Sequence, residues 1–222
     1  YLSLGTAIKL AREGAQYYQV NAYLHLDHAT DTSLIQACID HGYDSVMIDA
    51  SDKPFKDNVE ISRQVSEAAH KKGVFVEAEL GCVPKLGEQE AEESQLTLPT
   101  EASDFVNYTG VDLLAVAIGT AHGFYKKEPN LDLNRLKQIR HATEVPLVLH
   151  GGSGIEPELW REAIEGGISK INFATEIKDT FMKKLKCVLL QSDEIDLRKV
   201  FPQAIEEVQL LVEKKLSICH NL

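Results

Sequence analysis

Residues 147–154, LVLHGGSG, run from a short apolar segment through a histidine into a glycine-rich turn. A strand that is covered on both faces has this pattern, because it reads as a continuous apolar run that stops at a polar turn. Two other stretches have a similar outline, HLDH at 25–28 and AIGTAH at 117–122, and each ends in a histidine. The sequence therefore indicates buried parallel strands that lead into chemically reactive side chains.

Short apolar runs alternate with longer amphipathic stretches along most of the chain. We expect strands near residues 22–27, 45–49, 74–79, 113–118, 147–150 and 169–173. We expect helices near residues 31–42, 57–72, 101–109, 132–142, 156–166 and 175–190, after a first helix from Leu4 to Gln16. This alternation favours an α/β barrel or a doubly wound parallel sheet.

A closed (β/α)8 TIM barrel needs eight strands, whereas this sequence offers six. We therefore expect a single TIM-barrel domain over residues 1–222 that contains strands three to eight and lacks the first two βα units. The alternative is a shortened barrel that oligomerisation completes. Residues 197–217 are expected to form an amphipathic helix that packs on the barrel or on another subunit, which makes a homodimer or homotetramer the expected assembly.

The composition narrows the classes of function. The 222 residues carry a formal net charge of −11, which argues against a nucleic-acid surface, since phosphates are neutralised by clustered Lys and Arg. The four cysteines show no CxxC pairing, which fits a reducing cytoplasm. No apolar run approaches the roughly 20 residues that span a bilayer, and no signal peptide is visible. We expect a cytoplasmic protein that acts on a small molecule.

His28, His122 and His150 each follow an expected strand. A barrel gathers its strand ends on one rim, so the three side chains are expected to meet. Three neutral imidazoles with an open fourth position form a typical catalytic zinc site. One buried histidine alone is more often a hydrogen-bonded core residue, but three on one rim favour a metal. The remaining histidines are interpreted as structural or surface groups: His25, His41, His70, His141 and His220.

Three carboxylates are expected on the same rim. Asp27 is adjacent to His28, and neighbouring strand residues point to opposite faces, so both reach one site only where the backbone turns. Asp27 is then a general acid–base, the cap of the next helix, or a residue that orients a ligand. Asp49 and Glu79 either form a second metal position, hydrogen-bond the histidines or cap helices.

Two turns are candidates for binding a phosphate, HGGSG at 150–154 and NFATE at 172–176. Glycine lets the backbone approach an anion, and N–H groups at the start of a helix bind phosphate. In α/β barrels a phosphate commonly lies after strands seven and eight, which these turns follow if two units are missing. Gly123 offers a further backbone contact beside His122.

Together, HLDHAT, SVMIDASD, VEAELG, AVAIGTAHGFY, LVLHGGSG and KINFATE resemble the class II, metal-dependent ketose-bisphosphate aldolases over residues 24–185. The short segments between these motifs are more similar to the tagatose-bisphosphate branch than to the fructose-bisphosphate branch. The resemblance implies Zn²⁺ on His28, His122 and His150, proton transfer by Asp27, and an alternative metal position at Asp49 and Glu79. It implies that the dihydroxyacetone-phosphate end is held by Gly123, Gly151, Gly152, Ser153, Asn172, Phe173, Ala174 and Thr175, with Na⁺ or K⁺ near the glycine backbone.

The implied reaction is reversible cleavage of a tagatose or fructose 1,6-bisphosphate to dihydroxyacetone phosphate and glyceraldehyde 3-phosphate. Relatives usually read close to GGxED after ELG, whereas this chain reads CVPKLGEQE, so the lid acid stays unassigned, with Glu88 and Glu90 as candidates. The long irregular stretch around them, 81–100, is typical of either a lid or a solvated loop.

Two other functions are weighed against this one. A Schiff-base aldolase would use Lys170, but that residue is expected at the start of its strand, on the rim away from the site, as a surface group. A non-catalytic or regulatory sugar-phosphate binder is favoured by the altered lid and the shortened barrel.

Overall fold

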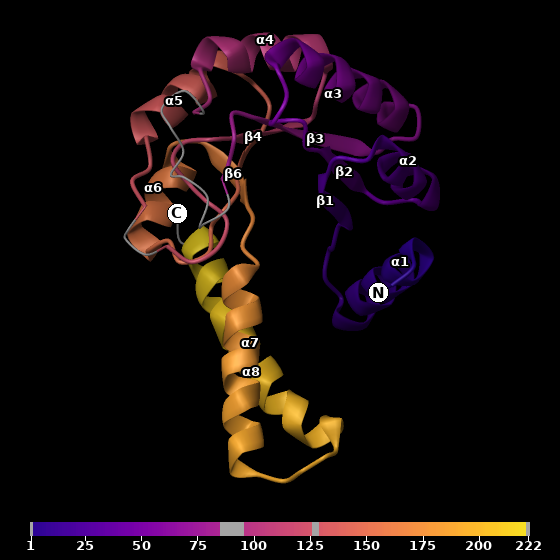
Figure 1. Ribbon diagram of the computed structural model, residues 1–222, viewed down its shortest axis with the longest axis vertical. Helices are drawn as coiled ribbons and strands as arrows, with labels where there is room; N and C mark the ends of the chain where they lie inside the picture. Colours follow the sequence, from indigo (N-terminus) through magenta and orange to yellow (C-terminus); the bar gives the residue numbers. More distant parts are fainter. Residues whose placement is uncertain (1, 85–95, 126–128, 221–222) are drawn as a thin grey trace.

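The computed structural model describes residues 2–84, 96–125 and 129–220, in which helices and strands alternate (Figure 1). The strands are β1 (His25–Ala29), β2 (Ser45–Ile48), β3 (Phe75–Leu80), β4 (Leu113–Val116), β5 (Leu147–Leu149) and β6 (Ile168–Ile171). The helices are α1 (Leu4–Tyr18), α2 (Thr32–His41), α3 (Phe55–His70), α4 (Pro99–Thr109), α5 (Leu133–Ala142), α6 (Pro157–Glu165), α7 (Thr175–Gln191) and α8 (Leu197–His220).

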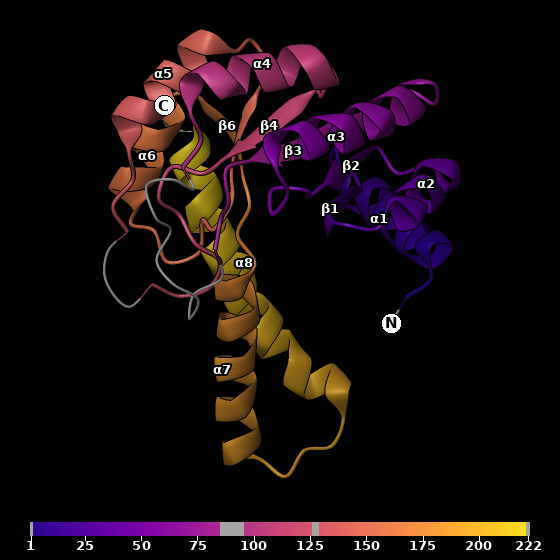
Figure 2. The ribbon, with the colours of Figure 1, turned by 45° about the horizontal axis from the view of Figure 1, so that its top comes forward.

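The strands form one parallel sheet whose spatial order, β1 to β6, is the order along the chain. The sheet is curled, and α2 to α6 cover its convex side (Figures 1 and 2). Parallel neighbours joined by crossover helices are the arrangement of α/β barrels. Among the described residues, no pairing joins β6 back to β1, so the fold is an α/β half-barrel.

The two faces of the sheet differ in chemistry. The main apolar core lies between the sheet and its helices, where Val46 and Leu114 pack with Phe105 and Trp160. Side chains alternate between the faces of a strand, so the next residues along β2, β4 and β5 face the concave side. There, Met47, Ala115 and Val148 form a second, small apolar cluster.

Strand register places charged residues on the concave face. Glu77 pairs with Met47, Glu79 with Ala115, and Lys170 with Val148. The inner surface of the half-barrel therefore combines a few apolar side chains with buried acids and one lysine.

The first strand differs from the expected range of 22–27. Its pairing with β2 shifts between Leu26 and Ala29, and His28 has φ of 48°. A non-glycine residue in the left-handed region is uncommon, and here it accompanies a bulge that continues β1 to Ala29. The helix α4 also starts earlier than expected, at Pro99, because proline suits the first position of a helix.

The last two helices lie side by side and project from the sheet (Figures 1 and 2). An apolar groove runs along the pair, and its lining includes Ile177, Phe181, Met182, Ile205 and Val208. The helix α8 continues to His220, beyond the expected end at 217. In the described part of the chain, no helix combines the length and the apolar character that a membrane span requires.

Candidate active site

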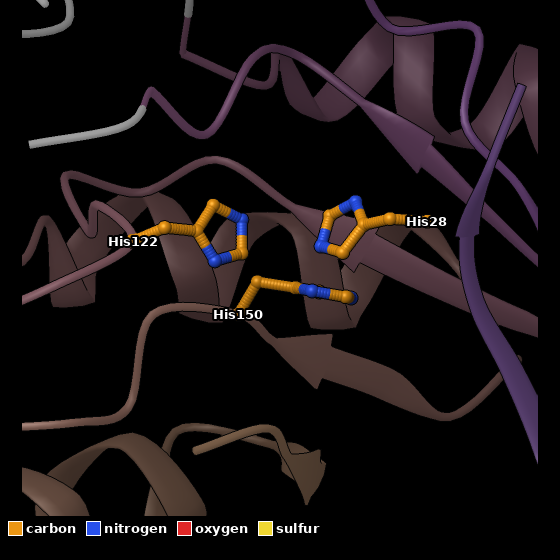
Figure 3. A group of neighbouring side chains, drawn as sticks. All are labelled: His28, His122 and His150. Atoms are coloured by element: carbon orange, nitrogen blue, oxygen red, sulfur yellow. The ribbon is translucent and has the colours of Figure 1, made fainter. Parts of the chain in front are cut away.

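Three imidazole rings converge at the carboxyl ends of the strands (Figure 3). His28 lies in β1, His122 in the loop that follows β4, and His150 directly after β5. The ring centroid of His28 lies 4.7 Å from that of His122 and 4.5 Å from that of His150, and the other pair is 5.8 Å apart. One nitrogen of each ring lies within 4.8 Å of the others. The structure thus brings together the three histidines that the sequence singled out.

Hydrogen bonding orients His28. Its Nδ1 donates to Asp49 Oδ2 at 2.8 Å, while Asp49 Oδ1 accepts from the backbone N–H and the hydroxyl of Ser51. Burial alone would raise the pKa of Asp49, but these hydrogen bonds outweigh it and lower the pKa to about 2. Asp49 is not a helix cap, since α3 begins after Pro54.

The environment of the other ring nitrogen of His28, Nε2, shows whether the site suits a metal ion. Among the described residues, His28 Nε2 is buried and has no hydrogen-bond partner. Buried polar atoms in proteins are almost always paired, and this one lies on the ring that the other two histidines surround. A cation that takes three imidazole nitrogens would satisfy it, so the residues present fit a metal ion.

His122 is in the form that binds metals. Burial lowers its pKa, and the neighbouring His28 and His150 lower it further, to about 4. For His28, burial acts against protonation, but the bond to Asp49 and the nearby carboxylates outweigh it and raise the pKa. At neutral pH His122 is therefore a neutral donor, whereas a metal at His28 would compete with a proton that this ring holds more tightly than a free imidazole does.

Glu79 belongs to a second group of possible ligands with His28 and Asp49, whose ligand atoms also lie within 4.8 Å of one another. Glu79 Oε1 accepts from the N–H of Val83 at 3.1 Å, and Oε2 is buried with no hydrogen-bond partner among the described residues. Burial, and then the charge of Asp49, raise the pKa of Glu79 to about 8. A cation here would offset the repulsion between the two carboxylates.

Asp27 lies on the same rim and its side chain is half exposed. Its Oδ1 accepts from Asn172 Nδ2 at 3.1 Å, and the same amide nitrogen lies 3.4 Å from His150 Nδ1. The left-handed backbone at His28 explains how two adjacent residues both reach this rim. Asp27 does not cap α2, because Asp31 does.

The loops after β4, β5 and β6 are tied together. Gly152 donates its N–H to the carbonyl of Asn172 at 2.9 Å. The hydroxyl of Tyr125 accepts from the N–H of Ala121 at 2.8 Å and donates to the carbonyl of Gly151 at 2.9 Å. The two predicted phosphate turns therefore lie side by side, although the N–H of Gly152 is engaged within the protein.

The remaining predicted phosphate residues are also near these loops. Ser153 is buried, and its hydroxyl accepts from the N–H of Glu176 at 3.3 Å. The ring centroid of Phe173 lies 5.5 Å from that of Trp160, so the ring is engaged in packing and the backbone of Phe173 is the part that could contact a ligand. Ala174 provides no side-chain cap for α7, so an anion could occupy the start of that helix.

Residues 2–222 match the sequence family described as fructose-bisphosphate aldolase class II. The chain belongs to this family. The class II aldolases are generally metal-dependent lyases, so the non-catalytic alternative is not retained.

The aldolase is similar to solved structures from two bacteria. The YdjI aldolase from Escherichia coli K12 shares 33% sequence identity with a TM-score of 0.84, and the match covers 97% of this chain and 76% of that one. The fructose-bisphosphate aldolase from Campylobacter jejuni shares 22% identity with a TM-score of 0.80, covering 97% of this chain and 75% of that one. The second likeness shows the shared fold.

Sequence reasoning missed a buried acid beneath the histidines of this aldolase. Glu77 is fully buried, with Oε1 2.8 Å from His150 Nε2 and Oε2 2.9 Å from Lys170 Nζ. The expectation of a surface role for Lys170 is wrong, because alternate residues of β6 face the concave side and its amine reaches Glu77. An ammonium paired in this way is no free nucleophile, which argues against the Schiff-base alternative. Glu88 and Glu90 lie outside the described residues.

His25, which was predicted to be a structural or surface group, lies next to this buried acid. Its Nδ1 lies 2.6 Å from the hydroxyl of Ser45, and its Nε2 lies 3.8 Å from both Asp27 and Glu77. The sequence signal that could have identified Glu77 and His25 is the alternation of polar residues at every second position of a strand. Glu77 and Glu79 alternate in VEAELG, and His25 and Asp27 alternate in HLDH, so each pair faces one side of its strand.

Proposed function

We propose that this aldolase catalyses the reversible, zinc-dependent cleavage of a ketose 1,6-bisphosphate, tagatose or fructose, to dihydroxyacetone phosphate and glyceraldehyde 3-phosphate. The family supports aldol cleavage of ketose bisphosphates in general. The observation that carries the proposal is the convergence of His28, His122 and His150 around a buried, unpartnered imidazole nitrogen.

The zinc ion would be held by three histidines: His28 through Nε2, His150 through Nδ1, and His122. Asp49 occupies Nδ1 of His28, which leaves Nε2 as the donor of that ring. When bound, zinc supplies a Lewis acid that polarises the ketone oxygen and stabilises the charge released as the C3–C4 bond breaks. Asp49 and Glu79 are proposed as an alternative metal position, supported by the unpartnered Oε2 of Glu79.

Asp27 is proposed as the residue that moves the proton. In cleavage it accepts the proton of the C4 hydroxyl as C4 becomes the aldehyde, and in synthesis it returns that proton. Its half-exposed carboxylate lies on the open rim, where a substrate can reach it. The hydrogen bond from Asn172 holds Asp27 beside His150.

The phosphate of the dihydroxyacetone half is proposed to bind at Gly123, at Gly151–Ser153 and at Asn172–Thr175. The contact between Gly152 and Asn172 supports this, because it sets the two turns next to each other at the start of α7, where Ala174 offers no side-chain cap. Na⁺ or K⁺ near the glycine backbone is part of the proposal, on the family resemblance alone.

The six-stranded sheet is proposed to be part of a (β/α)8 barrel, on the evidence of its curvature and its chain-order pairing. The apolar groove along α7 and α8 supports a homodimer or homotetramer that this helix pair helps to form. The short segments between the sequence motifs favour tagatose 1,6-bisphosphate as the substrate.

A coupled assay that oxidises or reduces the triose products tests the proposal on both bisphosphates. We expect cleavage of at least one, faster for the tagatose compound, and loss of cleavage in His122→Ala. The matched control is His141→Ala, which removes an exposed imidazole whose Nδ1 donates to the backbone carbonyl of Lys137 within α5. Normal turnover and normal zinc binding by His122→Ala would refute the proposed site.

A further inference from the structure

A buried carboxylate, Glu77, contacts His150 on the side of the ring that carries Nε2. Glu77 and His150 are both fully buried, and Glu77 Oε1 lies 2.8 Å from His150 Nε2. The second oxygen of Glu77 lies 2.9 Å from Lys170 Nζ. Each oxygen of Glu77 thus has its own partner, which fixes the rotation of the carboxylate about its last bond.

These contacts determine which nitrogen of His150 carries a proton. A carboxylate only accepts hydrogen bonds, so the nitrogen that faces Glu77, Nε2, is the donor. On the other side of the ring, the amide nitrogen of Asn172 lies 3.4 Å from Nδ1, and an amide nitrogen only donates. Both neighbours therefore favour one tautomer, in which Nδ1 carries a lone pair. Because Glu77 engages Nε2, Nδ1 is the nitrogen that His150 has left for the cluster with His28 and His122.

We propose that Glu77, held in place by Lys170, is a positioning residue of the metal site. It fixes the ring and the tautomer of His150 so that Nδ1 is ready to bind the metal. Carboxylates that accept from a metal-bound histidine commonly act in this way, and their loss weakens metal binding by roughly 10–100-fold. The inference rests on the proposed metal site.

Glu77 and the side chains near it do not form a second metal site. His25, Asp27 and Glu77 offer three ligand atoms within 4.8 Å of one another. The ammonium of Lys170, however, already contacts Glu77 Oε2, the oxygen that faces His25. A divalent cation there would meet a fixed positive charge, so the ammonium of Lys170 takes the place that a metal would need.

Glu77→Gln tests the inference because it keeps the shape and changes the donor pattern. The ammonium of Lys170 attracts the amide oxygen, which turns the amide N–H₂ toward His150. His150 Nε2 must then accept, and its proton moves to Nδ1, where it blocks the metal. We expect the zinc dissociation constant, measured by competition with a chromophoric chelator, to rise by roughly 10–100-fold.

The matched control is Asp112→Asn. Asp112 lies just before β4, at the opposite end of the sheet, and its Oδ2 lies 2.9 Å from His70 Nε2. This variant makes the same chemical change beside another histidine, and we expect it to leave zinc affinity unchanged. In Glu77→Gln/Lys170→Met the amide oxygen is free to turn back to His150, so we expect affinity to recover part of the way.

The outcomes separate this inference from the proposed function. A wild-type enzyme that binds no zinc overturns the metal site and the inference with it, before any variant is made. If the wild type binds zinc and Glu77→Gln binds it equally well, the inference alone is overturned. A loss that the double variant does not relieve overturns the part assigned to Lys170.

A measurement on the metal-free wild type applies even if Glu77→Gln does not fold. Nitrogen-15 NMR of the imidazole rings, with His150 assigned by its absence in His150→Gln, reports which ring nitrogen is protonated. We expect the proton on Nε2. A proton on Nδ1 would overturn the inference.

Discussion

Replacing Gly151 with alanine should separate two ligands of the metal site. Gly151 directly follows His150 and has φ of 70°, and a Cβ atom built on it would lie 2.4 Å from the carbonyl oxygen of Ala121, the residue before His122. That contact is with backbone, so one of the two loops must move. The added methyl group would therefore push apart the segments that carry His122 and His150.

The expected cost has two parts. An alanine in the left-handed region costs about 1–2 kcal/mol, and forcing an extra methyl group into a packed region adds about 1–3 kcal/mol. We thus expect the free energy of unfolding to fall by about 2–5 kcal/mol in Gly151→Ala. Gly73 isolates the first part, because its φ is also 70° but a Cβ there meets nothing within 4 Å. Gly73→Ala should cost only about 1–2 kcal/mol.

Urea unfolding of the two metal-free variants measures this difference, and chelator competition measures their zinc affinities. Gly151→Ala should be the less stable variant and should bind zinc more weakly than the wild type. Gly73→Ala should bind zinc normally, since Gly73 lies before β3 at the other end of the strands. Equal losses of stability, or unaltered zinc affinity in Gly151→Ala, would refute the reasoning.

Two further predictions concern the chemistry of the rim. Zinc affinity should fall as the pH falls through the raised pKa of His28 and should level off above that pKa, because below it zinc must displace a proton from the ring. His122, with a pKa of about 4, is neutral over the same range. Chelator competition at a series of pH values measures this dependence, and an affinity that does not change with pH would contradict it. Asp27→Asn should lower kcat for cleavage by about 10²–10⁴-fold. Its zinc affinity should stay close to that of the wild type, since Asp27 lies outside the three-histidine group. A steady-state assay and a zinc titration measure the two effects separately, and a variant that keeps its kcat would exclude Asp27 as the proton carrier.

The order of elements and the three histidines could be predicted because both depend on local patterns. Apolar runs mark the strands, and parallel strands joined by helices bring their carboxyl ends to one rim. His122 shows how far this logic extends, since it lies in a loop well past the end of β4 and still reaches the other two rings. The sequence shows which rim a residue occupies better than it shows the residue's exact place on that rim.

Features that depend on contacts between distant strands could not be predicted. The bulge at His28 depends on the pairing of β1 with β2. The sequence around His28 contains no glycine that would indicate a left-handed backbone there. The pairing of Glu77 with Lys170 joins residues that are 93 positions apart in the chain. Reading Lys170 as a surface residue followed the usual rule for lysine. Its side chain is still 31% exposed, but its amine reaches inward to a buried acid.

The dependence of cleavage on zinc tests the central claim most directly. The enzyme is stripped of metal with a chelator, and cleavage of tagatose and fructose 1,6-bisphosphate is followed as zinc is added back. The account predicts no cleavage by the metal-free enzyme and a rate that rises in proportion to added zinc until it saturates. Full cleavage before any zinc is added would contradict it.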